Sequence, residues 1–279
     1  MRKLLVPTDF SDTAGKALQY AAEIAQRSGA RIYLLHISSP VESPFIDAGL
    51  REQTNSEEGE KIKSSLAKLR EQILKNFPKV EIQTVRRPNP LVDGILDFAT
   101  EEAVDLIIMG TQGATGLRKI IIGSNAVEVL EETPIPLLLV PEKCECVLPS
   151  RIVLAANYET DDLDALRFIK QIADLFQSEV QLVNLLEAEN ANVGAEESEF
   201  KNYVSGLEEK TGLANLKTTQ ITCQSVNETF ACLDSQVPYD LLVMVRRRRG
   251  ALQSFFTGSA TERMAFITTL PMLIFPADE

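Results

Sequence analysis

The chain has 279 residues, of which 28 are Lys or Arg and 40 are Asp or Glu, for a net charge of −12. Its 44% hydrophobic and 24% charged content is typical of a soluble globular protein with room for two ordinary domains. The negative charge argues against nucleic-acid or membrane partners, because their phosphates would be repelled. Four cysteines without a neighbouring histidine predict free thiols in the cytoplasm.

The first half alternates short apolar strands with helices. Ser11 is a predicted helix N-cap, the apolar residues that follow recur at i, i+3 and i+4, and Gly29 lies just past the predicted helix end. Asn89 and Pro90 are expected at the N-cap and first position of a later helix. A polar loop is expected over residues 39–55, before a helix over 56–76. Strands are expected over residues 4–7, 32–37, 80–85, 105–109 and 137–140. Such alternation predicts an α/β fold with a parallel sheet covered on both faces.

A glycine-rich segment follows the fourth predicted strand. Gly110 and Gly113 allow a close approach of the backbone to a ligand, and Gly123 with Ser124 begins the next predicted helix. Ser124 is expected to be the N-cap, where its hydroxyl and unpaired N–H groups would form an anion site. The spacing is neither that of a Walker P-loop nor that of a dinucleotide fingerprint. Asp9 ends the first strand, so the two motifs share one crevice if the first and fourth strands are neighbours.

The strand–loop–helix pattern recurs 135 residues later. Gly258 and Ser259 correspond to Gly123 and Ser124, and residues 240–244 and 271–276 correspond to 105–109 and 136–141. The beginnings also match, residues 3–9 with 151–157. An internal duplication explains this spacing, with a boundary within residues 142–150. We therefore expect domains over residues 1–145 and 149–279.

Together, the pattern Gly-x2-Gly-x9-Gly-Ser, the early strand that ends in Asp, and the Pro-Leu-Leu-Leu-Val strand resemble the universal stress protein family. The resemblance covers both halves, as in a tandem member. It implies two Rossmann-like domains of the adenine-nucleotide α-hydrolase-like type. Each would have a five-stranded parallel sheet of order 3-2-1-4-5 flanked by helices. Many members bind ATP, and others lack the glycine motif and do not.

The resemblance also implies an adenine-nucleotide site in the first half. Asp9 would meet the ribose or a Mg²⁺ ion on the phosphates, Ile37 would offer backbone groups to the adenine edge, and Arg118 or Lys119 could add charge. The segment from Gly123 to Asn125 would hold the β- and γ-phosphates. The implied site residues are Pro7, Thr8, Asp9, Ile37, Met109, Gly110, Gly113, Gly123, Ser124 and Asn125.

The second half departs from this pattern. Val245 stands in place of Gly110, Arg248 in place of Gly113 and Asn157 in place of Asp9. Valine and arginine would crowd the phosphates, and asparagine has no carboxylate for a metal, so no conventional ATP site is expected there. The four arginines at residues 246–249 are interpreted as a solvated loop, with a phosphate-bearing ligand or an acidic partner as the alternative.

Catalysis finds little support in the sequence. His36, the single histidine, lies in a predicted strand and is expected to be a packed core or edge residue rather than a base. No nucleophile–base set can be assembled without it. The leading hypothesis is a cytoplasmic stress-response protein that binds ATP, ADP or AMP in its first half and so controls contacts with an unknown protein partner, relayed by residues 39–55.

Three alternatives remain open. The first is a nucleotide-free scaffold in which residues 137–140 and 272–275 pair within the chain as an intramolecular pseudo-dimer, with or without a further homodimer. The second is slow ATP hydrolysis involving Asp9 and Mg²⁺. The third is an ATP-using enzyme that acts on an unknown substrate.

Overall fold

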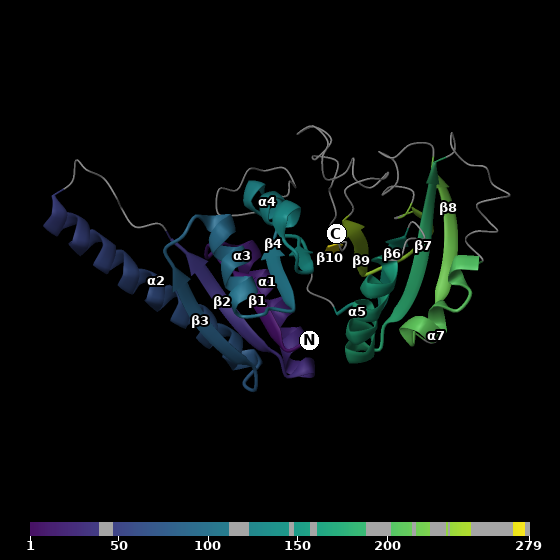
Figure 1. The fold of residues 1–279 in the computed structure, drawn as a ribbon. Helices are drawn as coiled ribbons and strands as arrows, with labels where there is room; N and C mark the ends of the chain where they lie inside the picture. The colour runs from purple at the N-terminus through teal and green to yellow at the C-terminus, as the bar shows by residue number, and fades with distance from the viewer. Residues whose placement is uncertain are drawn as a thin grey trace. The chain divides into compact units, whose positions relative to one another are not determined.

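The computed structural model describes residues 1–38, 47–111, 123–144, 148–156, 161–187, 202–213, 216–223, 233, 235–246 and 270–276 (Figure 1). Its contacts divide the chain into two compact units, and the division falls between Glu142 and Lys143. Among the described residues, no helix has the length and apolar character needed to cross a bilayer. The two units are described separately below.

Unit 1 is built on a parallel sheet with the strand order β3-β2-β1-β4-β5. The chain moves outward from β1 to β3 and then returns to the other side of β1, so the direction of winding reverses between β1 and β4. This confirms the predicted α/β class and the order 3-2-1-4-5. The strands are β1 (Lys3–Pro7), β2 (Arg31–Ile37), β3 (Glu81–Arg87), β4 (Leu106–Gly110) and β5 (Leu137–Val140).

Helices cover both faces of this sheet. Right-handed crossovers place α1 (Asp12–Ser28) and α2 (Ala48–Asn76) on one face and α3 (Leu91–Glu101) and α4 (Ser124–Glu132) on the other. In agreement, α1 contacts α2 and α3 contacts α4. The predicted ends of α1 are confirmed: the Ser11 side chain accepts a hydrogen bond from Ala14 N, and Gly29 adopts φ 71° in the left-handed region.

The predicted start of α2 was wrong. The helix begins at Ala48, where the Asp47 carboxylate accepts hydrogen bonds from two backbone N–H groups, so residues 48–55 of the predicted loop are helical. Residues 39–46 lie outside the described part. Apolar periodicity could not reveal the early turns, because the two buried side chains described in α2, Ile62 and Leu66, lie later in the helix.

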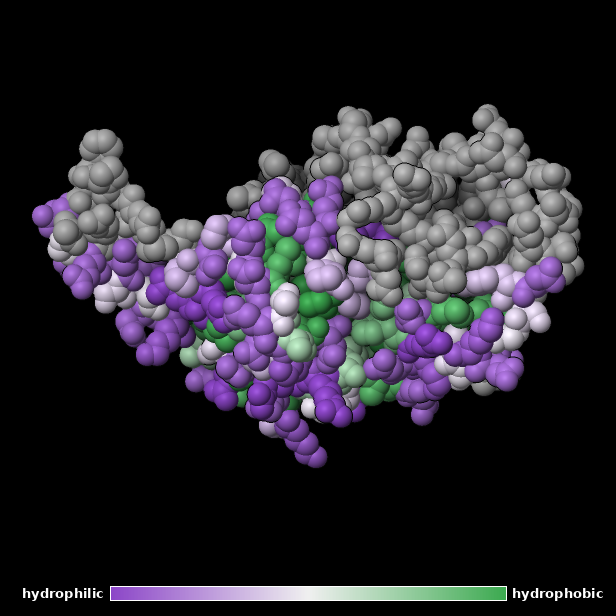
Figure 2. All heavy atoms as spheres, viewed as in Figure 1, coloured by the Kyte–Doolittle hydropathy of each residue, from purple (hydrophilic) through white to green (hydrophobic). Residues whose placement is uncertain are grey.

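Helix α2 is also much longer than the strand beside it. Its 29 residues span about 44 Å, whereas the seven residues of β3 span about 23 Å. The N-terminal part of α2 therefore extends beyond the edge of the sheet in unit 1 (Figure 1). Its surface is largely hydrophilic (Figure 2), although Leu50 is 57% exposed.

Two other helix starts differ from the predictions. Pro90, not Asn89, is the N-cap of α3, and no side chain caps that helix. Gly123, not Ser124, is the N-cap of α4, also without a side-chain hydrogen bond, and Ser124 is the first helical residue. Each shift is one residue, because sequence identifies a group of capping candidates better than the residue at which helical geometry begins.

Unit 2 repeats the topology with the order β8-β7-β6-β9-β10, again parallel. Lys3 pairs with Arg31 in unit 1 and Arg151 pairs with Glu179 in unit 2, so the first two strands have the same spacing in both units. The predicted pairing of residues 137–140 with 272–275 stays a prediction. The elements are β6 (Arg151–Ala156), α5 (Asp161–Phe176), β7 (Glu179–Glu187), α7 (Leu207–Thr211), β8 (Lys217–Cys223), β9 (Leu241–Arg246) and β10 (Met272–Pro276).

In both units, an aspartate carboxylate accepts hydrogen bonds from the backbone at the start of the first strand. Asp105, before β4, accepts hydrogen bonds from the backbone N–H groups of Arg2 and Lys3. Asp240, before β9, accepts from Ser150 N at 3.0 Å and Arg151 N at 2.9 Å. The duplication thus preserves side-chain contacts as well as strand order.

Candidate functional site

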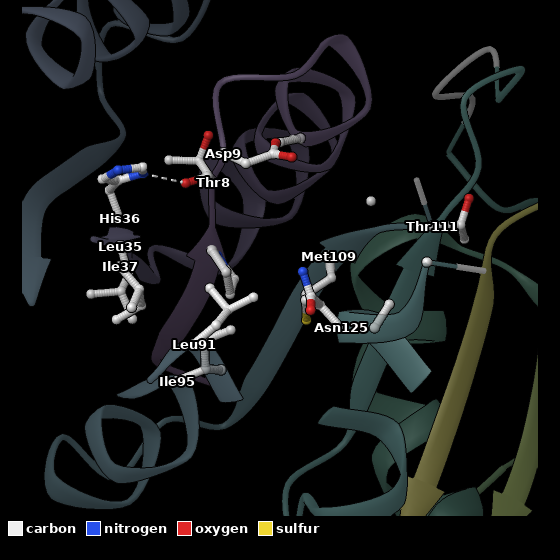
Figure 3. A pocket seen from close by; sticks show the side chains of 15 residues that line it. Thr8, Asp9, Leu35, His36, Ile37, Leu91, Ile95, Met109, Thr111 and Asn125 are labelled. Atoms are coloured by element: carbon white, nitrogen blue, oxygen red, sulfur yellow. Dashed lines mark hydrogen bonds between the residues drawn. The ribbon is translucent and has the colours of Figure 1, made fainter. Parts of the chain in front are cut away.

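A pocket opens in unit 1 at the carboxyl ends of β1, β2 and β4, where the strand order reverses (Figure 3). Its volume of about 110 Å³ is below the roughly 300–1,000 Å³ of pockets that enclose a whole drug-sized ligand, so it can hold one ring-sized portion of a ligand. The pocket is lined by Pro7, Thr8, Asp9, Ala14, Leu35, His36, Ile37, Leu91, Ile95, Met109, Gly110, Thr111, Gly123, Asn125 and Ala126.

Most of the predicted site residues meet on this lining. The two exceptions are Ser124, which is exposed and does not line the pocket, and Gly113, which lies outside the described residues. Arg118 and Lys119 also lie outside them. The predicted residues on the lining are Pro7, Thr8, Asp9, Ile37, Met109, Gly110, Gly123 and Asn125.

The turn after β1 places the Asp9 carboxylate at the pocket. Thr8 N donates to Leu35 O at 2.8 Å, which continues the pairing of β1 with β2 by one residue. Phe10 N then donates to Thr8 Oγ1 at 3.1 Å, and Ser11 N donates to Asp9 Oδ1 at 3.0 Å. Side chains of the turn thus bind its own backbone N–H groups, and Asp9 itself is exposed.

The end of β2 presents backbone groups to the same pocket. In a strand, the N–H and C=O of one residue point to the same side, and alternate residues point to alternate neighbours. Leu35 O accepts from Thr8 N on the β1 side, whereas Ser38 N donates to Arg87 O on the β3 side. Ile37 comes two residues after Leu35, so its N–H and C=O also point towards the β1 side. Strand β1 has already ended at this position. Ile37 thus offers a donor beside an acceptor.

Gly110 has a packing role that the sequence did not indicate. A Cβ at this position would lie 2.6 Å from Thr13 Cγ2 and 2.9 Å from the Thr13 carbonyl carbon. Such distances are far inside van der Waals contact, so α1 can pack this closely on β4 because residue 110 has no side chain. Close approach of α1, in addition to the predicted approach of a ligand, explains a glycine here.

The start of α4 provides N–H groups. Val127 N makes the first hydrogen bond within the helix, to Gly123 O, which leaves the N–H groups of Ser124, Asn125 and Ala126 without an acceptor inside the helix. The helix dipole adds partial positive charge at this end. Asn125 and Ala126 line the pocket, so an anionic group of a ligand would find backbone donors here.

The described lining contains few ionisable groups. Asp9 and His36 are its titratable side chains, and none of the described lining residues is Lys or Arg. Among the described residues, no cluster of three His, Cys, Asp or Glu could hold a metal ion. Asp9 alone suits a Mg²⁺ ion that is bound mainly through the phosphates of a ligand, which is the usual mode for this ion.

Sequence reasoning missed several lining residues. His36 was expected to be a packed core or edge residue, but its place on the lining was not predicted; it is half-buried, with Nδ1 2.7 Å from Thr8 O (Figure 3). The helical periodicity of α3 identifies apolar positions but not the strand ends they face. The apolar residues that were missed are Ala14, Leu35, Leu91, Ile95 and Ala126.

Unit 2 differs at the corresponding positions. Val245, in place of Gly110, is fully buried in β9, Ala156 stands in place of Thr8, and Asn184 stands in place of His36. The other predicted departures, Asn157 and Arg248, lie outside the described residues, as do residues 247–249, 258 and 259.

Comparisons with known proteins agree with this architecture. The model of the universal stress protein family matches residues 1–141. Universal stress protein MJ0577 of Methanocaldococcus jannaschii is 31% identical over 157 residues, which cover 51% of this chain and 96% of that protein. Universal stress protein Slr1230 of Synechocystis is 22% identical over an alignment that covers 99% of this chain and all of that protein.

A solved universal stress protein from Archaeoglobus fulgidus has the same fold, with a TM-score of 0.66 at 18% identity, covering 99% of this chain and 97% of that chain. The family model spans unit 1, and the full-length matches extend over unit 2. These findings confirm the resemblance noted in the sequence: the chain belongs to the universal stress protein family, as a member with two tandem units.

Proposed function

We propose that unit 1 binds ATP, or another adenine nucleotide such as ADP or AMP, and that nucleotide occupancy controls contacts of this cytoplasmic stress-response protein with a protein partner. The observation that carries the proposal is the convergence of three kinds of group on one pocket: the backbone of Ile37, the carboxylate of Asp9 and the start of α4 at Asn125. Each suits a different part of a nucleotide.

The end of β2 suits an adenine base. The N7/N6 edge of adenine presents an acceptor beside a donor, whereas the same edge of guanine presents two acceptors. Ile37 offers a donor and an acceptor on one side of its strand, which complements adenine. Leu91, Ile95 and Met109 supply apolar surface for the faces of the base. We expect ATP to bind more tightly than GTP.

The opposite part of the pocket suits ribose and phosphates. Asp9 would accept hydrogen bonds from ribose hydroxyls or ligate Mg²⁺ on the phosphates, where the ion would neutralise negative charge. The N–H groups at the start of α4 would bind phosphate oxygens. Titrating ATP with Mg²⁺ and again with EDTA separates the two roles of Asp9, because the Asp9→Ala effect persists in EDTA if the carboxylate binds ribose.

The binding stoichiometry tests the proposal directly. Calorimetry on the intact chain should give one ATP per chain, and acid extraction of the purified protein should release adenine nucleotide. Asp9→Ala and Gly113→Arg should each weaken binding at least about tenfold, the equivalent of ~1.4 kcal/mol. Asp164→Ala, which removes an exposed carboxylate of unit 2, serves as the matched control. Two equivalents would refute the single site, and no binding at all would favour the scaffold alternative.

The proposal assigns regulation, not rapid catalysis, to the nucleotide. The described lining residues include no Lys or Arg that would stabilise charge on a transferring phosphate group. Phosphate release from ATP should therefore be slow, on the scale of a timer. Rapid release that depends on an added small molecule would instead indicate an ATP-using enzyme.

A further inference from the structure

The backbone of Phe10 has an unusual conformation beside the pocket. Its φ of 66° lies in the left-handed region, which bulky residues other than glycine seldom adopt. Such a conformation persists when surrounding contacts hold it, and it is found most often at functional sites. Phe10 directly follows Asp9, so its conformation sets the direction in which the turn carries the Asp9 carboxylate.

His36 contacts this turn at both ends. Its Nδ1 lies 2.7 Å from Thr8 O, and because a carbonyl oxygen can only accept, Nδ1 is the nitrogen that carries the proton. Its ring packs on the Phe10 ring with centroids 4.6 Å apart and an interplanar angle of 34°. The Phe10 N–H is occupied by Thr8 Oγ1 at 3.1 Å. Thr8 and Phe10 are thus fixed on either side of Asp9.

The duplication preserves the first of these contacts. In unit 2, Asn184 Nδ2 donates to Ala156 O at 3.1 Å, and the two residues are 28 positions apart, as are His36 and Thr8. An imidazole in unit 1 and an amide in unit 2 therefore donate the same hydrogen bond, from the second strand to a backbone carbonyl at the end of the first strand. Unit 2 provides an amide that can replace the imidazole in this role.

Asp9 lies on the turn between these two fixed residues. The residue is exposed, and its carboxylate accepts a hydrogen bond from the neighbouring Ser11 N at 3.0 Å. This bond ties the carboxylate to the backbone of the turn, so a change in the turn would change the direction of the carboxylate. We propose that His36 and Phe10 are positioning residues that hold this turn in its strained form and so aim Asp9 at the bound ligand. This inference rests on the proposed nucleotide site.

The test uses the full chain and two ligands. ATP carries the ribose and phosphates that Asp9 would meet, and adenine lacks both. His36→Ala should weaken ATP binding about tenfold, as expected for loss of one well-made hydrogen bond together with its ring contact, and leave adenine binding unchanged. His36→Asn, which introduces the side chain that Asn184 provides in unit 2, should recover most of the lost affinity. In the Asp9→Ala background, His36→Ala should have no further effect on ATP, because the group that it positions is gone.

Other outcomes would overturn the inference. Additive losses from His36→Ala and Asp9→Ala would show that the two residues act independently, and an equal loss for adenine would place His36 on the base. Phe10→Ala, which leaves the bond from His36 to Thr8 in place, supplies a second variant and should also weaken ATP without affecting adenine. Unchanged ATP affinity in Phe10→Ala would argue against the strained turn.

A measurement without ligand separates this inference from the proposed function. In the nucleotide-free chain, the Phe10 amide should exchange with solvent faster in His36→Ala than in the wild type, and His36→Asn should restore its protection. Equal protection in all three would overturn the inference even if ATP binds. If the wild type does not bind ATP but the exchange pattern is as expected, the nucleotide site is refuted while the role of His36 in holding the turn is supported.

Discussion

Gly110 in unit 1 and Val245 in unit 2 are corresponding residues, but the surroundings of Gly110 leave no room for a side chain. Val245 is fully buried in unit 2, whereas a Cβ at Gly110 would collide with Thr13. Gly110→Val should lower the stability of unit 1 by about 1–3 kcal/mol, the usual cost of overpacking, measured by thermal unfolding. Gly15→Ala is the control, since no atom lies within 4 Å of its Cβ, and it should be neutral or stabilising. Unchanged stability in Gly110→Val would show that α1 can shift away from β4.

Individual residues also show where prediction from sequence ends. Asp9 could be placed at the pocket because the end of an apolar run marks the end of a strand, whereas Ile37 was implied by the family resemblance. The left-handed conformation of Phe10 could not be predicted, because this residue lies in a turn that contacts a residue 26 positions later in the sequence. The contact of His36 could not be predicted either, because the sequence does not show which carbonyl group a strand histidine will meet.

The ends of the first helix in each unit form a matched pair. Gly29 after α1 has φ 71°, and Gln177 after α5 has φ 57°, so one left-handed position holds glycine and the other does not. Gly29→Ala should destabilise unit 1 by roughly 1 kcal/mol through the backbone alone, because no atom would meet the new Cβ. Gln177→Gly should stabilise unit 2 by a similar amount. Chemical denaturation checks both, and equal signs for the two changes would contradict the argument.

The start of β6 should depend on pH through Asp240. Partial burial raises the pKa of this carboxyl, but Arg151 and two backbone N–H groups outweigh it and lower the pKa overall. The contact therefore adds stability above the pKa of an unfolded Asp, about 3.9, and the stability is lost as the pH falls further. Asp240→Asn should cost roughly 0.5–1 kcal/mol at pH 7, a value reduced for solvent screening, and progressively less as the pH falls below the pKa of an unfolded Asp. A cost that does not change with pH would show that packing, not charge, is involved.

At the level of whole elements, β1, β2, β4 and β5 were predictable because consecutive apolar residues are buried on both of their faces, whereas β3 is an edge strand with mostly exposed or half-buried residues. The structure confirms the strand positions of unit 1 within two residues and the order 3-2-1-4-5. The early turns of α2 could not be predicted, because none of their described side chains is buried to mark a helical face. The Ser124 error has another cause, since glycine and serine are both acceptable N-caps and stand side by side.

For the whole molecule, the two-unit division leads to a prediction about fragments. All of the described residues that line the pocket belong to unit 1. Residues 1–145 alone should therefore fold and bind ATP with the affinity of the intact chain, whereas residues 149–279 should fold without binding it. Circular dichroism and calorimetry on the two fragments check this. A folded but inactive first fragment would mean that unit 2 contributes to the site.

The length of α2 has a consequence for how this chain can change. The first turns of α2 extend beyond the edge of the sheet in unit 1 and bury no described side chain. Substitutions there should therefore change the free energy of unfolding little, usually by no more than about 0.5 kcal/mol. The core under the pocket has no such freedom, as Gly110 shows. The chain therefore separates a surface that can diversify from a pocket that must stay fixed, and a new partner could be acquired at the former without altering the latter.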